Sequence, residues 1–274
     1  MKCSLLILFS FVFLTAFHLY AAEVDMTAKP EAGKQVAQNI QLPKSTGAWN
    51  TNGGDVSVLL HTSKQLDETA SEDFRYWIFL PKDYDADSAD KTWPLMIFLH
   101  GAGERGTDLA KVKVHGPPKK LEEAEFRDNC RFIVVSPQCL EGNYWSAKQI
   151  LLLLDSLEKS YKVDKKKIYV TGLSMGGFGT WMLAAEAPQR FAAMVPICGG
   201  GDSGAASKMV DLPIWAFHGE QDRVVRPELS RKMIEAIEKA GGKKAKLTVY
   251  PDAEHDSWTE TYNNPELYKW MLQQ

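Results

Sequence analysis

The chain has 274 residues, of which 45% are hydrophobic, 24% charged and 11% aromatic, and its formal net charge is −3. This composition is that of a globular protein with one sizeable core, and it excludes a fibrous or wholly disordered chain. The weak negative charge and the lack of a long lysine or arginine block argue against nucleic acid or a membrane surface as a partner.

Residues 1–22 read as a secretory signal peptide. Lys2 precedes an apolar run over residues 5–17, and Ala21 and Ala22 supply small residues at its end. A basic start, an apolar core and small residues near the cleavage site are typical of an export signal. An uncleaved N-terminal anchor is the alternative, because the cleavage site is not clean. We therefore expect a secreted or periplasmic protein.

The remaining chain divides into an arm and one domain. Residues 23–50 are polar and rich in proline and lysine, which predicts a poorly ordered N-terminal arm. Residues 51–274 alternate apolar runs with turns, without an internal repeat or a long linker. Strands are expected at residues 56–60, 74–80, 94–100, 131–136, 167–171, 192–198, 213–218 and 246–250, and helices at 147–160, 178–187 and 227–240. Such alternation predicts an α/β fold with a mostly parallel sheet and helices on both faces.

A G-x-S-x-G pattern over residues 172–176 is the most informative motif of the chain. It centres on Ser174, and it joins a predicted strand to a predicted helix. A turn this tight leaves little room for side chains on its flanks, so glycine is favoured there. The turn exposes the serine oxygen and directs the first N–H groups of the helix toward a reacting carbonyl. We expect Ser174 to be a nucleophile.

Two further residues follow in the order that a catalytic triad needs. Asp222 comes after the apolar strand at 213–218, and His255 comes after the strand at 246–250. Serine is a poor nucleophile until a base takes its proton, so we expect His255 as the base and Asp222 as the acid that orients it. Asp202 and Asp252 are the rival acids, and Asp252 is too near His255 in sequence to orient it easily.

The strand at 94–100 runs into a loop of small residues. Backbone N–H groups of Ala102 or Gly103 in this loop can approach a developing oxyanion, and the N–H of Met175, after the nucleophile, is the second expected donor. His100 and His218 each precede a glycine at a strand end, and we interpret both as scaffold residues.

Three aromatic side chains are candidates for a substrate pocket. Trp145 follows a strand end, His115 lies in a loop and Trp258 closely follows His255. Each has a plain structural alternative, which is a loop residue for His115 and a core or helix-cap residue for Trp145.

These motifs together resemble the prolyl-oligopeptidase-like and feruloyl-esterase-like group of the α/β-hydrolase superfamily. The resemblance spans residues 75–272, and its matching segments are 75–84, 93–106, 136–139, 172–176, 218–222 and 265–270. It implies the α/β-hydrolase fold and a serine triad, and it leaves the substrate open, because this fold hosts many acyl transfers. Only about 14 residues separate the strand ending at Cys198 from the next one, so we expect no large lid.

The resulting hypothesis is a secreted serine hydrolase that cleaves a small or polymer-borne carboxylic ester through an acyl-enzyme. A serine peptidase with the same triad is one alternative, and a non-catalytic binding protein on the same fold is another. No cofactor and no metal are expected, because the histidines and cysteines lack closely spaced ligand pairs. Cys130, Cys139 and Cys198 are expected to be free thiols, because Cys130 and Cys139 flank an extended strand that separates them too far for a disulfide.

Overall fold

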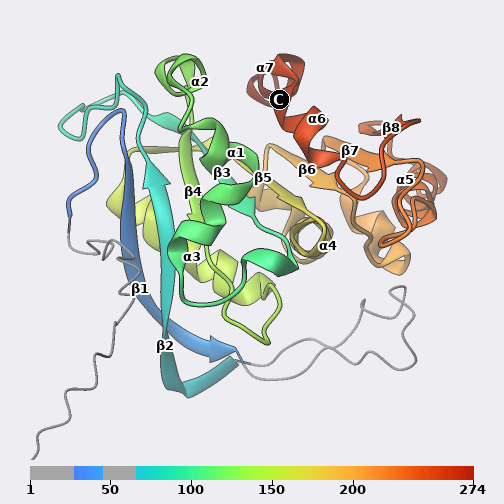
Figure 1. Ribbon diagram of the computed structural model, residues 1–274, viewed down its shortest axis with the longest axis horizontal. Coiled ribbons are helices and arrows are strands. Elements are labelled where there is room, and N and C mark those ends of the chain that lie inside the picture. Colours follow the sequence, from blue (N-terminus) through green and yellow to red (C-terminus); the bar gives the residue numbers. More distant parts are fainter. Residues whose placement is uncertain (1–27, 46–65) are drawn as a thin grey trace, which may run out of the picture.

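The computed structural model describes residues 28–45 and 66–274, whose strands form a single sheet (Figure 1). The strands are β1 (Gln35–Ser45), β2 (Leu66–Phe79), β3 (Trp93–Leu99), β4 (Ile133–Pro137), β5 (Val163–Leu173), β6 (Ala193–Ile197), β7 (Ile214–Gly219) and β8 (Ala245–Tyr250). Their spatial order is β1-β2-β4-β3-β5-β6-β7-β8. β2 is antiparallel to β1 and β4, and the pairs from β4 through β8 are parallel. The predicted α/β-hydrolase fold is confirmed.

The helices follow the predicted alternation in the second half of the chain. The α-helices are α1 (Gly116–Lys120), α2 (Ala124–Asn129), α3 (Ala147–Ser160), α4 (Met175–Glu186), α5 (Glu228–Lys239), α6 (Trp258–Asn263) and α7 (Pro265–Leu272). α3 has the predicted bounds because Ser146 caps it, its hydroxyl accepting a hydrogen bond from the Gln149 N–H at 3.5 Å. Short 3₁₀ segments cover Ala102–Glu104 (η2), Leu109–Val114 (η3), Pro188–Arg190 (η4) and Ser203–Met209 (η5).

The sheet separates two hydrophobic layers. In β3, Leu95, Ile97 and Leu99 face one layer, whereas Met96 and Phe98 face the other. This alternation follows from the two-residue period of a strand, and it makes every β3 side chain apolar because both faces are covered. Helices α3, α4 and α5 supply the first layer, and α2, α6 and α7 supply the second, together with Leu121 at the end of α1. Both layers hold the central strands rigidly under the loops at their carboxyl ends.

The N-terminal arm differs from its prediction. Residues 35–45, which were expected in a polar arm over 23–50, form the edge strand β1 and pair along β2. The physical reason is a short two-residue alternation, in which Ile40 and Leu42 pack on the core while Asn39 and Gln41 are exposed. Asn39 and Gln41 both donate to the Asp73 carboxylate on β2, so the polar face of β1 is itself tied to the sheet.

Two predictions lie outside the described residues, namely the signal peptide at 1–22 and the strand at 56–60. Within the described part of the chain, no helix has the length and apolar character needed to cross a bilayer. The segment between β6 and β7 contains only η5, which packs against α4 and α5. No lid therefore rises between these two strands.

Candidate active site

Ser174 occupies a strained turn between β5 and α4. Its backbone has φ 52° and ψ −116°, a conformation that side-chain-bearing residues rarely adopt. The turn is held from below, because the Ser174 N–H donates to the Ile197 carbonyl at 3.0 Å. A Cβ on Gly176 would lie 1.8 Å from the Leu99 carbonyl oxygen, and one on Gly172 would lie 2.4 Å from the Gly176 oxygen. The two flanking glycines are thus required by close backbone contacts.

Three side chains from separate strand ends meet at this turn. Ser174 Oγ lies 2.9 Å from His255 Nε2, and His255 Nδ1 lies 2.7 Å from Asp222 Oδ2. Asp222 follows β7 and His255 follows β8, and parallel strands bring such loops to one edge of the sheet. The His255 side chain is 20% exposed and that of Asp222 is 0% exposed. This arrangement can move a proton from the serine hydroxyl to the imidazole while the carboxylate orients the ring.

Asp222 is fixed by more than His255. Its Oδ1 accepts hydrogen bonds from the Val224 N–H at 2.8 Å and the Val225 N–H at 2.9 Å, and His218 Nε2 lies 3.3 Å from Oδ2. Burial by itself would raise the pKa of Asp222, but the hydrogen bonds from His218, His255 and Val225 outweigh it and hold the pKa far below its usual range. Asp222 is therefore an anion wherever the protein is folded near neutral pH.

The rival acids occupy other roles. Asp202 caps η5, since its carboxylate accepts the Gly204 N–H at 2.8 Å. Asp252 is exposed in the turn after β8.

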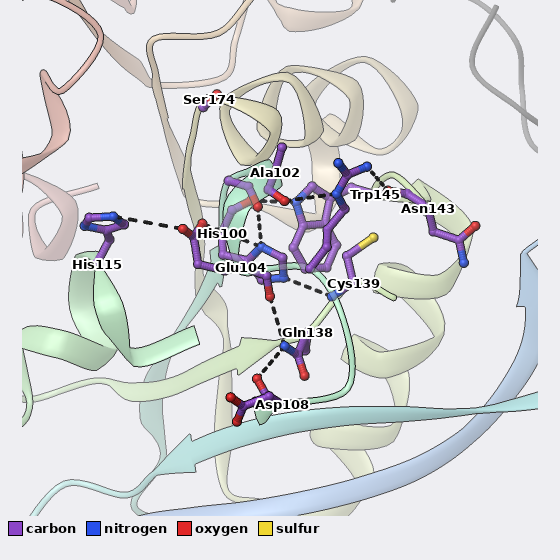
Figure 2. Close-up of polar contacts among 12 residues, drawn as sticks. His100, Ala102, Glu104, Asp108, His115, Gln138, Cys139, Asn143, Trp145 and Ser174 are labelled. Atoms are coloured by element: carbon purple, nitrogen blue, oxygen red, sulfur yellow. Dashed lines mark hydrogen bonds and ion pairs between the residues drawn. The ribbon is translucent and has the colours of Figure 1, made fainter. Parts of the chain in front are cut away.

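The predicted oxyanion donors lie at the starts of two helical segments. The exposed residues Ala102 and Gly103 belong to η2, separated from β3 by two residues, and the buried Met175 directly follows Ser174 as the first residue of α4. The first N–H groups of a helical segment have no partner within that segment, so they are available to a ligand. Figure 2 shows Ala102 and the buried residues beneath it. His100 Nδ1 lies 2.6 Å from the Gly101 carbonyl oxygen, and Gln138 Nε2 donates to the backbone carbonyl oxygen of Glu104 at 2.9 Å.

Trp145 differs from its expected place in the pocket. Its side chain is in the core, 2% exposed, and its Nε1 donates to the His100 carbonyl at 3.0 Å (Figure 2). The ring also packs against the His100 ring, with centroids 4.7 Å apart. A buried tryptophan needs a partner for its N–H, and the turn after β3 supplies one. Trp145 therefore supports the loop that carries Ala102 and Gly103, and its ring does not line a substrate surface.

His115 and Trp258 do come together beside His255. The Trp258 ring lies 5.3 Å from the His255 ring and 5.3 Å from the His115 ring, both measured between centroids. A cavity of about 140 Å³ between α1 and α6 is lined by both residues, together with Lys119, Thr259 and Asn263. Of the three pocket candidates, two thus share one cavity next to the candidate base.

Sequence reasoning missed two polar residues of this region. Glu104 is only 12% exposed at its side chain, with Oε1 4.0 Å from His115 Nε2 and Oε2 4.0 Å from His100 Nδ1. Gln138 is 2% exposed and also donates to the Asp108 carbonyl at 2.7 Å, so it closes the loop over 104–108 (Figure 2). The available signal was position, because Glu104 directly follows the small residues at 101–103 and Gln138 lies two residues after the predicted strand at 131–136.

Cys198 lies closer to the site than its sequence suggests. All three cysteines of the described residues are free thiols, as predicted. Cys198 Sγ accepts the Ser174 N–H at 3.2 Å, and its sulfur lies within 4.8 Å of ligand atoms of Asp222 and His255. Such a trio could in principle hold a metal, but burial raises the pKa of the Cys198 thiol well above its usual range, and Asp222 Oδ2 already binds His255. The three groups are thus engaged with Ser174 and one another, which does not fit a metal site.

Comparison with known proteins indicates the superfamily of this chain. A family model described as the dienelactone hydrolase family matches residues 141–267, the stretch that contains Ser174, Asp222 and His255. The solved structure of a thermostable esterase is 35% identical and superposes with a TM-score of 0.65, covering 76% of this chain and 61% of its own. The chain belongs to the α/β-hydrolase superfamily.

Curated relatives of this α/β-hydrolase cover it only in part. A bifunctional acetylxylan esterase/xylanase from Neocallimastix patriciarum is 27% identical over 48% of the chain and 20% of its own length. A poly(3-hydroxyalkanoate) depolymerase from Paucimonas lemoignei is 34% identical over 39% of the chain and 28% of its own length. The α/β-hydrolase described here thus spans less than a third of either relative.

Proposed function

We propose that this α/β-hydrolase cleaves carboxylic esters through an acyl-enzyme on Ser174. The observation that carries the proposal is the continuous contact from Ser174 Oγ through His255 to Asp222, at 2.9 and 2.7 Å, on a strained and accessible turn. The names of its esterase and depolymerase relatives support the same reaction class.

In this mechanism Ser174 Oγ attacks the ester carbonyl as His255 Nε2 takes the hydroxyl proton. The N–H groups of Met175 and of Ala102 or Gly103 stabilise the oxyanion. His255 then gives its proton to the departing alcohol, which leaves an acyl group on Ser174. Water repeats the sequence, with His255 first as base and then as acid, and releases the carboxylic acid. Asp222 remains an anion and stabilises the imidazolium that forms in each half-reaction.

The first experiment separates ester from amide hydrolysis. An amine must be protonated as it departs, whereas an alkoxide or phenolate leaves more easily, so a peptidase depends more on gripping the chain around the scissile bond. The short segment between β6 and β7 offers little such grip. We expect kcat/KM to be at least about 100-fold higher on an ester than on an amide with the same acyl group, about 2.7 kcal/mol of transition-state stabilisation.

Ser174→Ala is the blank for this comparison, and a covalent phosphonate probe followed by peptide mass mapping tests the nucleophile directly. Comparable rates on the ester and the amide would favour a serine peptidase. A Ser174→Ala protein with full turnover would favour a protein that uses the fold without the triad.

We further propose that the cavity beside Trp258 receives the larger end of the ester. Trp258 offers an apolar wall, while Lys119, Thr259 and Asn263 offer a cation, a hydroxyl and an amide for polar groups such as those of hydroxycinnamoyl or sugar moieties. Trp258→Ala should lower kcat/KM for a feruloyl ester about tenfold more than for an acetyl ester of the same alcohol, because only the larger group reaches the lost wall. Trp258→Phe is the matched control, and an equal loss on both esters would contradict this placement.

We also propose that the protein is exported. The motivating feature is the sequence of residues 1–22, with Lys2 ahead of the apolar run at 5–17. The mature chain should begin within a few residues of Glu23. N-terminal sequencing of the exported protein checks this, and a mature chain that still begins at Met1 would contradict cleavage.

A further inference from the structure

We infer that His218 is a positioning residue for the candidate acid Asp222. Asp222 thus contacts two histidines, His218 and His255. The inference rests on the proposed triad and adds a fourth member to it. Both histidines approach the same oxygen, with His255 Nδ1 at 2.7 Å and His218 Nε2 at 3.3 Å from Asp222 Oδ2. His218 is fully buried, at the end of β7 and four residues before Asp222.

The hydrogen on Nε2 of His218 follows from its neighbours. Nε2 lies 2.8 Å from the Val225 carbonyl oxygen as well as 3.3 Å from the carboxylate of Asp222. Both oxygens only accept hydrogen bonds, so Nε2 must carry a hydrogen. His218 therefore donates toward Asp222 and toward the backbone of the loop that presents Asp222.

The same ring is anchored on its other side. Nδ1 lies 2.7 Å from Ser230 Oγ, and this hydroxyl lies 2.9 Å from the Gly199 carbonyl oxygen. Ser230 is on α5 and Gly199 follows β6, so the ring plane is fixed by two elements outside its own strand. A ring held in this way keeps its Nε2–H aimed at the loop over 222–225.

The loop closes on itself through His218. Val225 donates its N–H to Asp222 Oδ1 at 2.9 Å, while its carbonyl contacts His218 Nε2. Removing the His218 donor would free the Val225 carbonyl and leave Oδ2 to His255 alone. The negative charge of Asp222 would then fall more heavily on His255, making that imidazole more basic. Among the described residues, the Cys198 thiol also lies at this point, where burial keeps it protonated, and the Asp256 carboxylate interacts electrostatically with that thiol.

Two substitutions separate the donor from the packing. A glutamine amide nitrogen can reach the place of Nε2, so His218→Gln keeps a donor toward Asp222 and Val225. An asparagine amide reaches only the place of Nδ1, so His218→Asn keeps the Ser230 contact and loses that donor. We expect His218→Asn to lower kcat roughly 10- to 100-fold with little change in KM, the range for losing a hydrogen bond to a charged group. We expect the acid limb of its kcat/KM profile to move to higher pH, and His218→Gln to restore most of both properties.

The inference would be overturned if kcat fell equally in the two variants, the acid limb stayed in place and Tm fell along with kcat. His218 would then be a packing residue. Should neither variant fold, two-dimensional ¹⁵N–¹H spectroscopy of the unmodified protein decides. A hydrogen on His218 Nε2 supports the inference, and a bare Nε2 overturns it. His255→Ala distinguishes the two proposals. If His255→Ala does not lower turnover, the proposed triad itself is wrong. If His255→Ala lowers turnover but His218→Asn leaves it unchanged, only the proposed role of His218 is wrong.

Discussion

Two histidine–glycine pairs lie at the ends of two parallel strands, and their surroundings give them different roles. His100-Gly101 directly follows β3, and His218-Gly219 forms the end of β7. The hydrogen bonds of His100 are to backbone, with Nδ1 facing the Gly101 carbonyl and Nε2 accepting the Cys139 N–H at 3.0 Å, and the Glu104 carboxylate lies 4.0 Å from Nδ1. His218 instead lies 3.3 Å from the carboxylate of the candidate acid Asp222. The same dipeptide thus lies beneath the candidate oxyanion loop in one place and beside the candidate acid in the other, so its neighbours decide its role.

The largest expected effect tests which histidine is the base. His255→Ala should lower kcat/KM by about 10⁴-fold or more on a nitrophenyl ester, because triad members act as a unit. Neither His100 nor His218 touches Ser174 Oγ, so their variants should retain far more activity. The measurement is steady-state turnover of variants whose folded state is verified by circular dichroism. Turnover that is lost in His218→Ala but kept in His255→Ala would reverse the assignment.

The second largest effect concerns stability, because alanine substitutions of the two glycines, Gly101 and Gly219, should differ in their cost. A Cβ on Gly219 would lie 2.1 Å from the Glu254 carbonyl oxygen, whereas one on Gly101 would meet the flexible Leu173 Cδ1 at 2.8 Å and Glu104 Oε2 at 3.1 Å. Backbone yields less than side-chain tips, so Gly219→Ala should cost about 3 kcal/mol of unfolding free energy and Gly101→Ala about 1 kcal/mol. Gly219→Ala should also displace the loop of His255 and lower kcat. Urea unfolding of both variants checks the order, and equal costs would refute it.

The pH dependence of stability should carry the signature of His100. Burial, opposed by the Gly101 contact, lowers the pKa of His100 from 6.5 to about 4. Between these pH values the unfolded chain binds a proton at His100 that the folded protein does not bind. The free energy of unfolding therefore falls as the pH falls from 6.5 toward 4, by up to about 3 kcal/mol. His100→Gln, whose amide oxygen can still accept the Cys139 N–H, should flatten the slope in this range. Unfolding free energies measured at pH 7.0, 5.5 and 4.5 test this, and identical slopes in both proteins would count against it.

The smallest expected effect concerns Gln138, which supports the candidate oxyanion loop on the His100 side. Gln138→Ala removes the two hydrogen bonds that hold the Glu104 and Asp108 carbonyls, so kcat should fall about tenfold while KM stays nearly constant. Gln149→Ala is a matched control, because this buried glutamine donates to the distant Pro43 carbonyl at 3.1 Å. A similar fall of kcat in both variants would mean that lost stability, rather than loop geometry, is responsible.

The sequence was sufficient for the parts of the site that depend on chain order. Ser174, Asp222 and His255 each follow a parallel strand, so topology alone brings them to one edge. The sequence was insufficient where the hydrogen-bond partner of a side chain comes from a distant segment. Trp145 follows a strand end like a pocket residue, yet its N–H is needed by His100, and nothing local reveals this. The edge strand β1 was missed because its apolar alternation is short and surrounded by polar residues.

The position of β8 has a consequence for how activity is gained during folding. β8 pairs only with β7 along the described sheet edge, and the loop that follows it supplies His255. The Glu220 and Gln221 N–H groups donate to the Tyr250 and Ala253 carbonyls, so the loop is placed only when β8 has docked. The elbow of Ser174, built from central strands, can form earlier. Recovery of turnover in a refolding experiment should therefore report the docking of this last strand, and it should lag behind the formation of the core beneath Ser174.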